Sequence, residues 1–154
     1  FFGVEMAGDK VDYGQGDFLI RNITGVDPND GSISVAMLPA QWQVAQFHLR
    51  DARTAAQELQ DGLERYCATD PATPPQGALM FTCLGRGMQH FGRPDHDTDV
   101  FQEHFGEVPL SGFFCNGEIG PVGGTTFLHG YTSVFAVFRA VTGEPSTAPE
   151  QAAS

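Results

Sequence analysis

The chain has 154 residues, and its 19 acidic and eight basic side chains give a formal net charge of −11. Its length and its 13 phenylalanines allow one domain with a real hydrophobic core, which excludes disorder of the whole chain. So acidic a surface repels phosphate backbones and anionic lipids, and Lys10 is the only lysine, so we expect neither nucleic acid nor a membrane as a partner.

The first 38 residues predict a lead-in and a hairpin. Residues 1–16 are rich in glycine and acidic side chains and predict an irregular lead-in, with a short edge strand at Val4–Met6. Apolar runs predict strands over 18–23 and 33–38. Because the residues of 27–31 (Asp-Pro-Asn-Asp-Gly) favour turn geometry, they join the two strands as a hairpin loop.

A third strand and a long helix are predicted next. Polar and apolar side chains alternate over 42–49, which is typical of a strand with one buried face. Asp51 is a good N-cap because its carboxylate can accept hydrogen bonds from free backbone N–H groups. The helix that follows is expected to present one apolar face, formed by Ala52, Ala56, Leu59, Leu63 and Tyr66.

The second half of the chain alternates strands and loops. Residues 78–83 are almost continuously apolar, as expected of a strand covered on both faces, and 110–115 form a second such run. Asp97 is a candidate cap for a short helix between them. Two further strands, at 125–128 and 133–139, are expected to complete the sheet.

Together these elements predict an α/β or α+β fold, with a mixed β-sheet of about six strands and two main helices. The short helix makes one βαβ crossover, so the strands near 78–83 and 110–115 run parallel. The folded domain is expected to cover 17–140. The tail of 141–154 is rich in Pro, Ser, Ala and Glu and is expected to be disordered.

Each of these two parallel strands ends in a cysteine followed by a glycine-rich loop. Open α/β sheets bind ligands at the carboxyl ends of their parallel strands, where glycine N–H groups can face an anion. Arg86 can hold a carboxylate and Glu118 an ammonium group, so the pattern favours a small zwitterion such as an amino acid. The predicted ligand-binding residues are Cys83, Gly85, Arg86, Gly87, Cys115, Asn116, Gly117, Glu118, Gly120 and His129.

Simpler interpretations of these residues stay open. Glycine at a strand end is most often turn geometry, cysteine there is most often a small buried hydrophobe, and Arg86 can pair with Asp95 or Glu118 at the surface. A nucleophile formed by His129 with one of the two strand cysteines has no supporting signature, and no Cys or His spacing fits a metal site. We therefore expect no catalytic residues, no metal and no cofactor.

The three cysteines and the first residues bear on location. Cys67, Cys83 and Cys115 are an odd number at long intervals, unlike the paired cysteines of small secreted domains, so we expect reduced thiols in the cytoplasm. No apolar run approaches the ~20 residues of a membrane helix, and no signal peptide is visible. The start at Phe1-Phe2, without a methionine, indicates a piece of a longer protein.

Four separated blocks resemble, in order, the C-terminal segment of the FIST family (F-box and intracellular signal transduction proteins). These blocks are Phe47–Asp51, Phe81–Gly87, Pro109–Pro121 and Phe127–Gly130. The resemblance implies an intracellular sensory module for small molecules, amino acids among them, joined to output domains in bacteria and archaea or to an F-box in eukaryotes. The family has no established catalytic residues. The resemblance also implies that the lead-in of 1–16 is cut from a FIST N-terminal half, without which a shared pocket is incomplete.

These observations favour a sensory domain that binds a small, amino-acid-like ligand and is not an enzyme. Its expected partners are that ligand, the FIST N-terminal half and an output or F-box domain. The alternative is a protein-interaction module that recruits substrates, as in F-box-linked relatives. A third class, a thiol-dependent enzyme, requires a cysteine with a lowered pKa and a histidine within hydrogen-bond reach.

Overall fold

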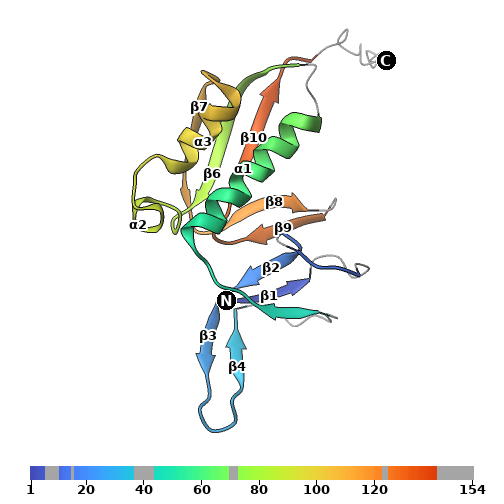
Figure 1. Cartoon of the computed structure of the whole chain (residues 1–154), viewed down its shortest axis with the longest axis vertical. Helices are drawn as coiled ribbons and strands as arrows, with labels where there is room; N and C mark the ends of the chain where they lie inside the picture. The colour runs from blue at the N-terminus through green and yellow to red at the C-terminus, as the bar shows by residue number, and fades with distance from the viewer. Residues whose placement is uncertain (6–10, 15, 37–43, 70–72, 123–124, 142–154) are drawn as a thin grey trace, which may run out of the picture.

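The computed structural model describes residues 1–5, 11–14, 16–36, 44–69, 73–122 and 125–141. In these ranges the chain has an α+β fold with ten strands and three helices, arranged as a helix-covered sheet with smaller β units beside it (Figure 1). The predicted class is confirmed, although we expected about six strands and two main helices. Most of the predicted tail and part of the predicted lead-in lie outside the described residues.

The main sheet has the strand order β10-β6-β7. Its central strand, β6 (Pro75–Cys83), pairs in parallel with β7 (Leu110–Cys115) and antiparallel with β10 (Ser133–Arg139). The short helix α2 (Met88–Phe91) and the helix α3 (His96–Phe105) connect the two parallel strands. The predicted βαβ crossover and its parallel strand pair are therefore confirmed.

The hydrophobic core lies between this sheet and its helices. The helix α1 (Ala52–Thr69) and α3 pack on the same side of the sheet (Figure 1). Leu59 and Leu63 of α1 meet Val100 of α3 in a buried cluster, against which Phe105 and Phe135 pack. The predicted N-cap of α1 is confirmed, because Asp51 Oδ1 accepts a hydrogen bond of 2.9 Å from the Thr54 N–H.

The opposite face of the main sheet is partly exposed, so the prediction that both strands are covered on both faces is wrong. Leu79 of β6 is 36% exposed and Phe113 of β7 is 63% exposed. Side chains alternate between the two faces of a strand, and both α1 and α3 lie on the same side. The apolar sequence of the two strands predicts cover on both faces, but within the described residues the helices cover one face of the sheet.

A second, three-stranded sheet has the order β2-β1-β5, in which both pairings are antiparallel. Its strands are β1 (Phe2–Glu5), β2 (Phe18–Arg21) and β5 (Ala45–Phe47). The strand predicted near Val4 therefore exists, but it is central in this sheet rather than at an edge. The strand predicted over 42–49 is present at β5, but all three residues of β5 are exposed, so the buried face expected for it is wrong. Residues 42 and 43 lie outside the described residues.

Two separate hairpins complete the fold. The strand predicted over 18–23 divides at Asn22, so that β3 (Ile23–Val26) pairs with β4 (Ile33–Val35) across the predicted turn. The strands β8 (Glu118–Val122) and β9 (Thr125–His129) form the other hairpin. The prediction that 125–128 joins the main sheet is wrong, because β9 pairs with β8 immediately before it.

Candidate functional site

The two predicted Cys-Gly edges lie side by side. Cys83 and Cys115 are partners in the parallel register of β6 and β7, and the Leu84 N–H donates to the Cys115 carbonyl oxygen at 2.9 Å. The juxtaposition expected from the sequence is therefore present at the carboxyl end of the sheet. The side chains that follow these cysteines have other roles than the ones predicted for them.

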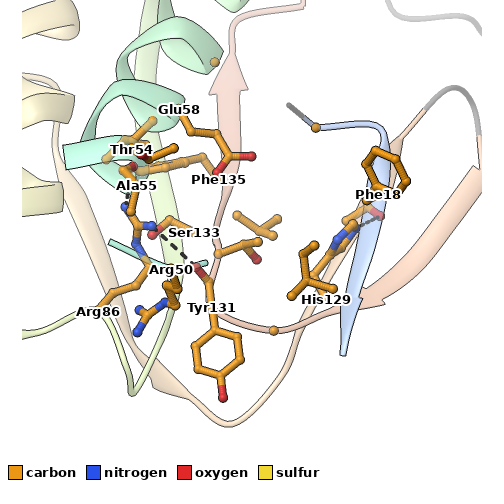
Figure 2. A pocket seen from close by; sticks show the side chains of 18 of the residues that line it. Phe18, Arg50, Thr54, Ala55, Glu58, Arg86, His129, Tyr131, Ser133 and Phe135 are labelled. Carbon is orange, nitrogen blue, oxygen red and sulfur yellow. Dashed lines mark hydrogen bonds between the residues drawn. The ribbon is translucent and has the colours of Figure 1, made fainter. Parts of the chain in front are cut away.

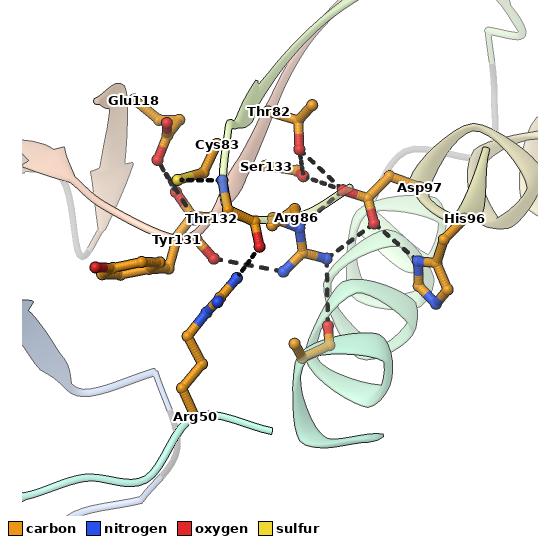
Figure 3. A network of polar contacts seen from close by, with 12 residues as sticks. Arg50, Thr82, Cys83, Arg86, His96, Asp97, Glu118, Tyr131, Thr132 and Ser133 are labelled. Atoms are coloured by element: carbon orange, nitrogen blue, oxygen red, sulfur yellow. Dashed lines mark hydrogen bonds and ion pairs between the residues drawn. The ribbon is translucent and has the colours of Figure 1, made fainter. Parts of the chain in front are cut away.

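Arg86 is the centre of a buried ion pair. Its Nε and Nη2 atoms donate to the two carboxylate oxygens of Asp97, at 2.8 Å and 3.0 Å, and Arg86 is 5% exposed (Figure 3). Its other hydrogen bonds are to the backbone carbonyl oxygens of Tyr131 and Ala55, each at 3.4 Å, and the guanidinium carbon lies 5.1 Å from the centre of the Phe91 ring. Arg86 is therefore not available as the free fork predicted for a ligand carboxylate.

The partner of Arg86 corrects two further predictions. Arg86 pairs with neither Asp95 nor Glu118 at the surface, but with buried Asp97. Asp97 does not cap α3; Asp95 occupies the N-cap position and Asp97 lies inside the first turn. Its position in the first turn of α3 directs the Asp97 carboxylate toward the sheet, where it pairs with Arg86 of the loop after β6.

Asp97 accepts hydrogen bonds from residues of two strands and of the loop after β6. Its Oδ2 accepts hydrogen bonds from Ser133 Oγ at 2.6 Å and Thr82 Oγ1 at 2.9 Å, while Oδ1 lies 2.9 Å from Nδ1 of His96. Burial alone raises the pKa of Asp97, but the hydrogen bonds and charge of Arg86, with the other donors, outweigh it and lower this pKa to about 2. The cluster is therefore an ionised, fully partnered element of the fold.

Glu118 also faces the interior. It is 1% exposed, and its carboxylate accepts hydrogen bonds from the Gly117 N–H at 3.2 Å and from Thr132 Oγ1, also at 3.2 Å. The Thr132 N–H adds a third contact, at 3.4 Å. Glu118 therefore connects the loop before β10 to the start of β8 through hydrogen bonds. Its carboxylate is not exposed to a ligand ammonium group, which differs from the role predicted for it.

A pocket of about 690 Å³ opens beside these clusters, between α1, β10, the loop before β10 and the β2 side of the fold (Figure 2). Of the ten predicted ligand-binding residues, three line it: Arg86, Gly120 and His129. The other seven do not line it: Cys83, Gly85, Gly87, Cys115, Asn116, Gly117 and Glu118. The cavity thus lies on the β10 side of the predicted edge.

Arg50 lines the pocket and was not among the residues predicted from the sequence. Its Nη2 donates to the Gly85 carbonyl oxygen at 2.7 Å, and its guanidinium carbon lies 4.5 Å from the centre of the Tyr131 ring. Its Nε is buried and has no hydrogen-bond partner among the described residues. Burial lowers the pKa of Arg50, against the opposing effect of Cys83. Arg50 belongs to the block 47–51 that resembles the FIST family, so the sequence did contain a signal for this residue. The alternation pattern served only to predict the end of a strand there.

Two histidines line the far side of the pocket. The His48 ring packs edge-on against Phe18 with centroids 4.9 Å apart, and its Nε2 is buried without a hydrogen-bond partner in the described ranges. Burial, followed by the positive charge of the N-terminus, lowers the pKa of His48. His129 Nε2 lies 3.1 Å from the Gly120 carbonyl oxygen, which places the ring N–H on that atom. This side of the pocket is therefore aromatic, and burial favours the neutral form of His48.

The hydrogen bonds of the Cys83 and Cys115 thiols are to backbone atoms. Cys83 is buried and its Sγ accepts a hydrogen bond from the Gly85 N–H at 3.4 Å. Loss of solvent, followed by the negative charge of Glu118, raises the pKa of the Cys115 thiol. Within the described ranges neither cysteine has a histidine as a hydrogen-bond partner, and no group of three or more metal-binding side chains occurs.

Across the part of the chain that the structure describes, no helix is both long enough and apolar enough to cross a bilayer.

Comparisons with known proteins identify relatives over most of the chain. A sequence model of the FIST C domain family matches residues 1–121. Two uncharacterized proteins of Mycobacterium tuberculosis are each 46% identical over 125 residues, which is 81% of this chain and 32% of theirs. The F-box/LRR-repeat protein of Arabidopsis thaliana is 29% identical over 77% of this chain and 25% of its own length. Human F-box only protein 22 is 28% identical over 75% of this chain and 28% of its own. The chain spans about a third or less of the length of these relatives.

Proposed function

Because the chain belongs to the FIST C domain family, we propose that it is a sensory domain for signal transduction, that it binds a small molecule in the pocket beside α1 and β10, and that it is not an enzyme. The observation that carries the proposal is Arg50. It lies in the pocket wall with a buried Nε that no described residue pairs, and only its Nη2 is anchored, on the Gly85 carbonyl oxygen.

Arg50 indicates the class of ligand. A guanidinium with N–H groups free of protein partners binds a carboxylate through charge-assisted hydrogen bonds, and stacking on Tyr131 holds it in place beforehand. Glu58 of α1 also lines the pocket, and Figure 2 shows it on the helix above Arg50. A carboxylate near Arg50 and an ammonium group near Glu58 describe a small zwitterion, so an amino acid remains the ligand we propose, held by residues other than those first predicted.

The size and walls of the pocket support a small organic ligand. Sites for such ligands usually enclose about 300–1,000 Å³ and combine apolar walls with a few polar groups. This pocket, at about 690 Å³, has apolar walls from Phe18, Leu59 and Phe135. Arg86 contributes its apolar stem, because its donors are occupied by Asp97, whose charge balances that of the guanidinium.

The properties of the thiols support a non-enzymatic role. The raised pKa of Cys115 keeps its thiol protonated near neutral pH, which opposes attack on a substrate. All three cysteines, Cys67, Cys83 and Cys115, are free, and from this we also propose a cytoplasmic location.

A protein-interaction module is the second candidate. The names of the plant and human relatives place F-box proteins among the proteins similar to this chain. Leu84, Met88 and Phe114 are exposed apolar side chains on or beside the loop after β6, where a protein partner can bury them. This candidate makes no use of Arg50.

A ligand screen with matched variants tests the proposal. The twenty amino acids and a set of short carboxylic acids are screened by thermal shift, and a hit is confirmed by calorimetry. We expect Arg50→Gln to weaken binding about tenfold or more, the equivalent of losing a charged hydrogen bond. Glu58→Gln should weaken amino acids while leaving simple carboxylic acids unchanged. Arg53→Gln on the exposed side of α1 is the control and should leave binding intact. If no compound shifts the Tm, or if Arg50→Gln binds like the parent chain, the pocket proposal fails and the interaction module gains support.

A further inference from the structure

The face of the main sheet that points away from α1 and α3 is apolar and partly exposed. Its open part, here called the uncovered face, consists of Leu79, Phe81, Phe113, Ala136 and Phe138. Phe113 is 63% exposed and Phe138 is 54% exposed, while Phe81 contacts the Phe113 ring at a centroid distance of 5.3 Å. The register of β10, β6 and β7 places all five side chains on the same side of the sheet.

The composition of this face is unusual for a sheet surface in contact with water. The positions of the three strands that share it, from 77 on β6 to 138 on β10, hold no charged side chain, and Ser111 is their one polar residue. Solvated sheet faces normally carry alternating polar residues, and parallel strand pairs are normally covered on both sides. An exposed apolar surface of this kind marks a place where another layer packs.

We propose that a further segment of the same polypeptide, outside residues 1–154, packs on the uncovered face as the second layer of the sheet. Three strands spaced by ~4.8 Å and about six residues of ~3.3 Å each give a face of roughly 300 Å². A stable complex of separate proteins buries about 800 Å² on each partner, so this face alone is too small to hold a second copy or a free protein. A tethered segment needs far less area, because the linker supplies a high effective concentration.

The lengths of the relatives indicate that such a segment exists in proteins similar to this chain. In the two mycobacterial proteins about two thirds of the chain lies outside the part that matches this sequence. The last residues of this chain do not fit the role, since 142–154 contain no apolar residue larger than alanine or proline. The proposal therefore places the covering layer beyond this sequence, with an apolar contact side.

Footprinting on the complete gene product tests this proposal. The open reading frame that encodes this sequence is expressed in full, and side-chain oxidation by hydroxyl radicals is read by mass spectrometry. Phe47 on β5 is the internal reference: it is 67% exposed and makes one edge-to-face contact, with Phe2 at 5.8 Å, much as Phe113 does with Phe81. We expect the oxidation rates of Phe113 and Phe138 to lie several-fold below that of Phe47.

Matched variants add a second readout. Phe113→Ser should lower the Tm of the complete protein by several degrees, because it removes a buried contact, whereas Phe47→Ser should leave the Tm nearly unchanged. If Phe113→Ser does not fold, the footprint of the unmodified protein decides. Oxidation of Phe113 as fast as Phe47, or a reading frame without a further segment, refutes the proposal. Protection that disappears on dilution, together with a dimer in light scattering, assigns the face to a second copy and refutes it as well.

Discussion

Replacing Asp97 by asparagine separates a structural ion pair from a ligand site. The substitution keeps the size of the side chain but removes the charge that faces Arg86, whose side chain is 3% exposed. Breaking a buried pair costs about 3–5 kcal/mol, because the remaining charge is left in the interior without a counterion. For a chain of this length that corresponds to a loss of about 6–20 °C in Tm. We expect Asp97→Asn to show a loss in this range at pH 7.

The pH dependence of stability provides an independent measure. The pKa of Asp97 lies near 2 in the fold against 3.8 in its ordinary state, so its contribution is complete above pH 4 and declines as the pH falls from 4 to 2. A shift of this size corresponds to about 2 kcal/mol. The difference in unfolding free energy between the parent chain and Asp97→Asn should therefore shrink by about 2 kcal/mol over this interval, as followed by urea unfolding at each pH.

Asp99→Asn is the matched control for this experiment. Asp99 lies one half-turn further along the same helix and pairs with Arg93, but both side chains are nearly half exposed. Exposed pairs contribute at most about 1 kcal/mol, so this variant should lose no more than about 4 °C. Equal losses for the two variants, or a Tm for Asp97→Asn within about 2 °C of the parent chain, would refute the assignment of Asp97 as the counterion that holds Arg86 in the core.

Two further substitutions test the packing of the sheet and the core. A Cβ added at Gly112 in β7 would lie 1.8 Å from the Met80 carbonyl oxygen, so Gly112→Ala should separate β7 from β6 and give little folded protein. Gly77→Ala is the control and should fold, because the nearest atom to its added Cβ is 3.8 Å away. Circular dichroism and expression yield measure folding in both variants. Leu63→Ala should lower the free energy of unfolding in urea by about 2–5 kcal/mol, because Leu63 packs in the buried cluster with Leu59 and Val100. Leu84→Ala, at an exposed position, should lower it by less than about 0.5 kcal/mol. An unchanged Leu63→Ala midpoint would place the core elsewhere.

Local patterns in the sequence predicted the elements on which the candidate site is built. The helical spacing after Asp51 and its capping carboxylate anticipated α1, because both depend only on residues within a few positions of one another. The parallel pairing that aligns Cys83 with Cys115 also followed, since a short crossover helix leaves few other topologies. The domain boundaries stay a prediction, and so does the tail.

The roles of the charged side chains did not follow from local pattern. Arg86 and Glu118 stand in glycine-rich loops, where exposed ligand contacts and buried structural contacts have the same sequence. In the structure Arg86 pairs with Asp97, eleven residues away, and Glu118 accepts a hydrogen bond from Thr132 on the loop before β10. Arg50 lines the pocket, although the sequence pattern around it was used only to predict the neighbouring strand.

The sequence by itself thus determined α1 and the crossover with its parallel strand pair, because hydrogen-bond periodicity, turn chemistry and capping act between near neighbours in the chain. The family followed from the resemblance of separated blocks. Only the tertiary structure decided which cation is buried with a counterion and which one faces a cavity. That choice depends on the desolvation of groups brought together from α1, α3, β6 and β10, and no local pattern contains the dielectric surroundings that such an assembly creates.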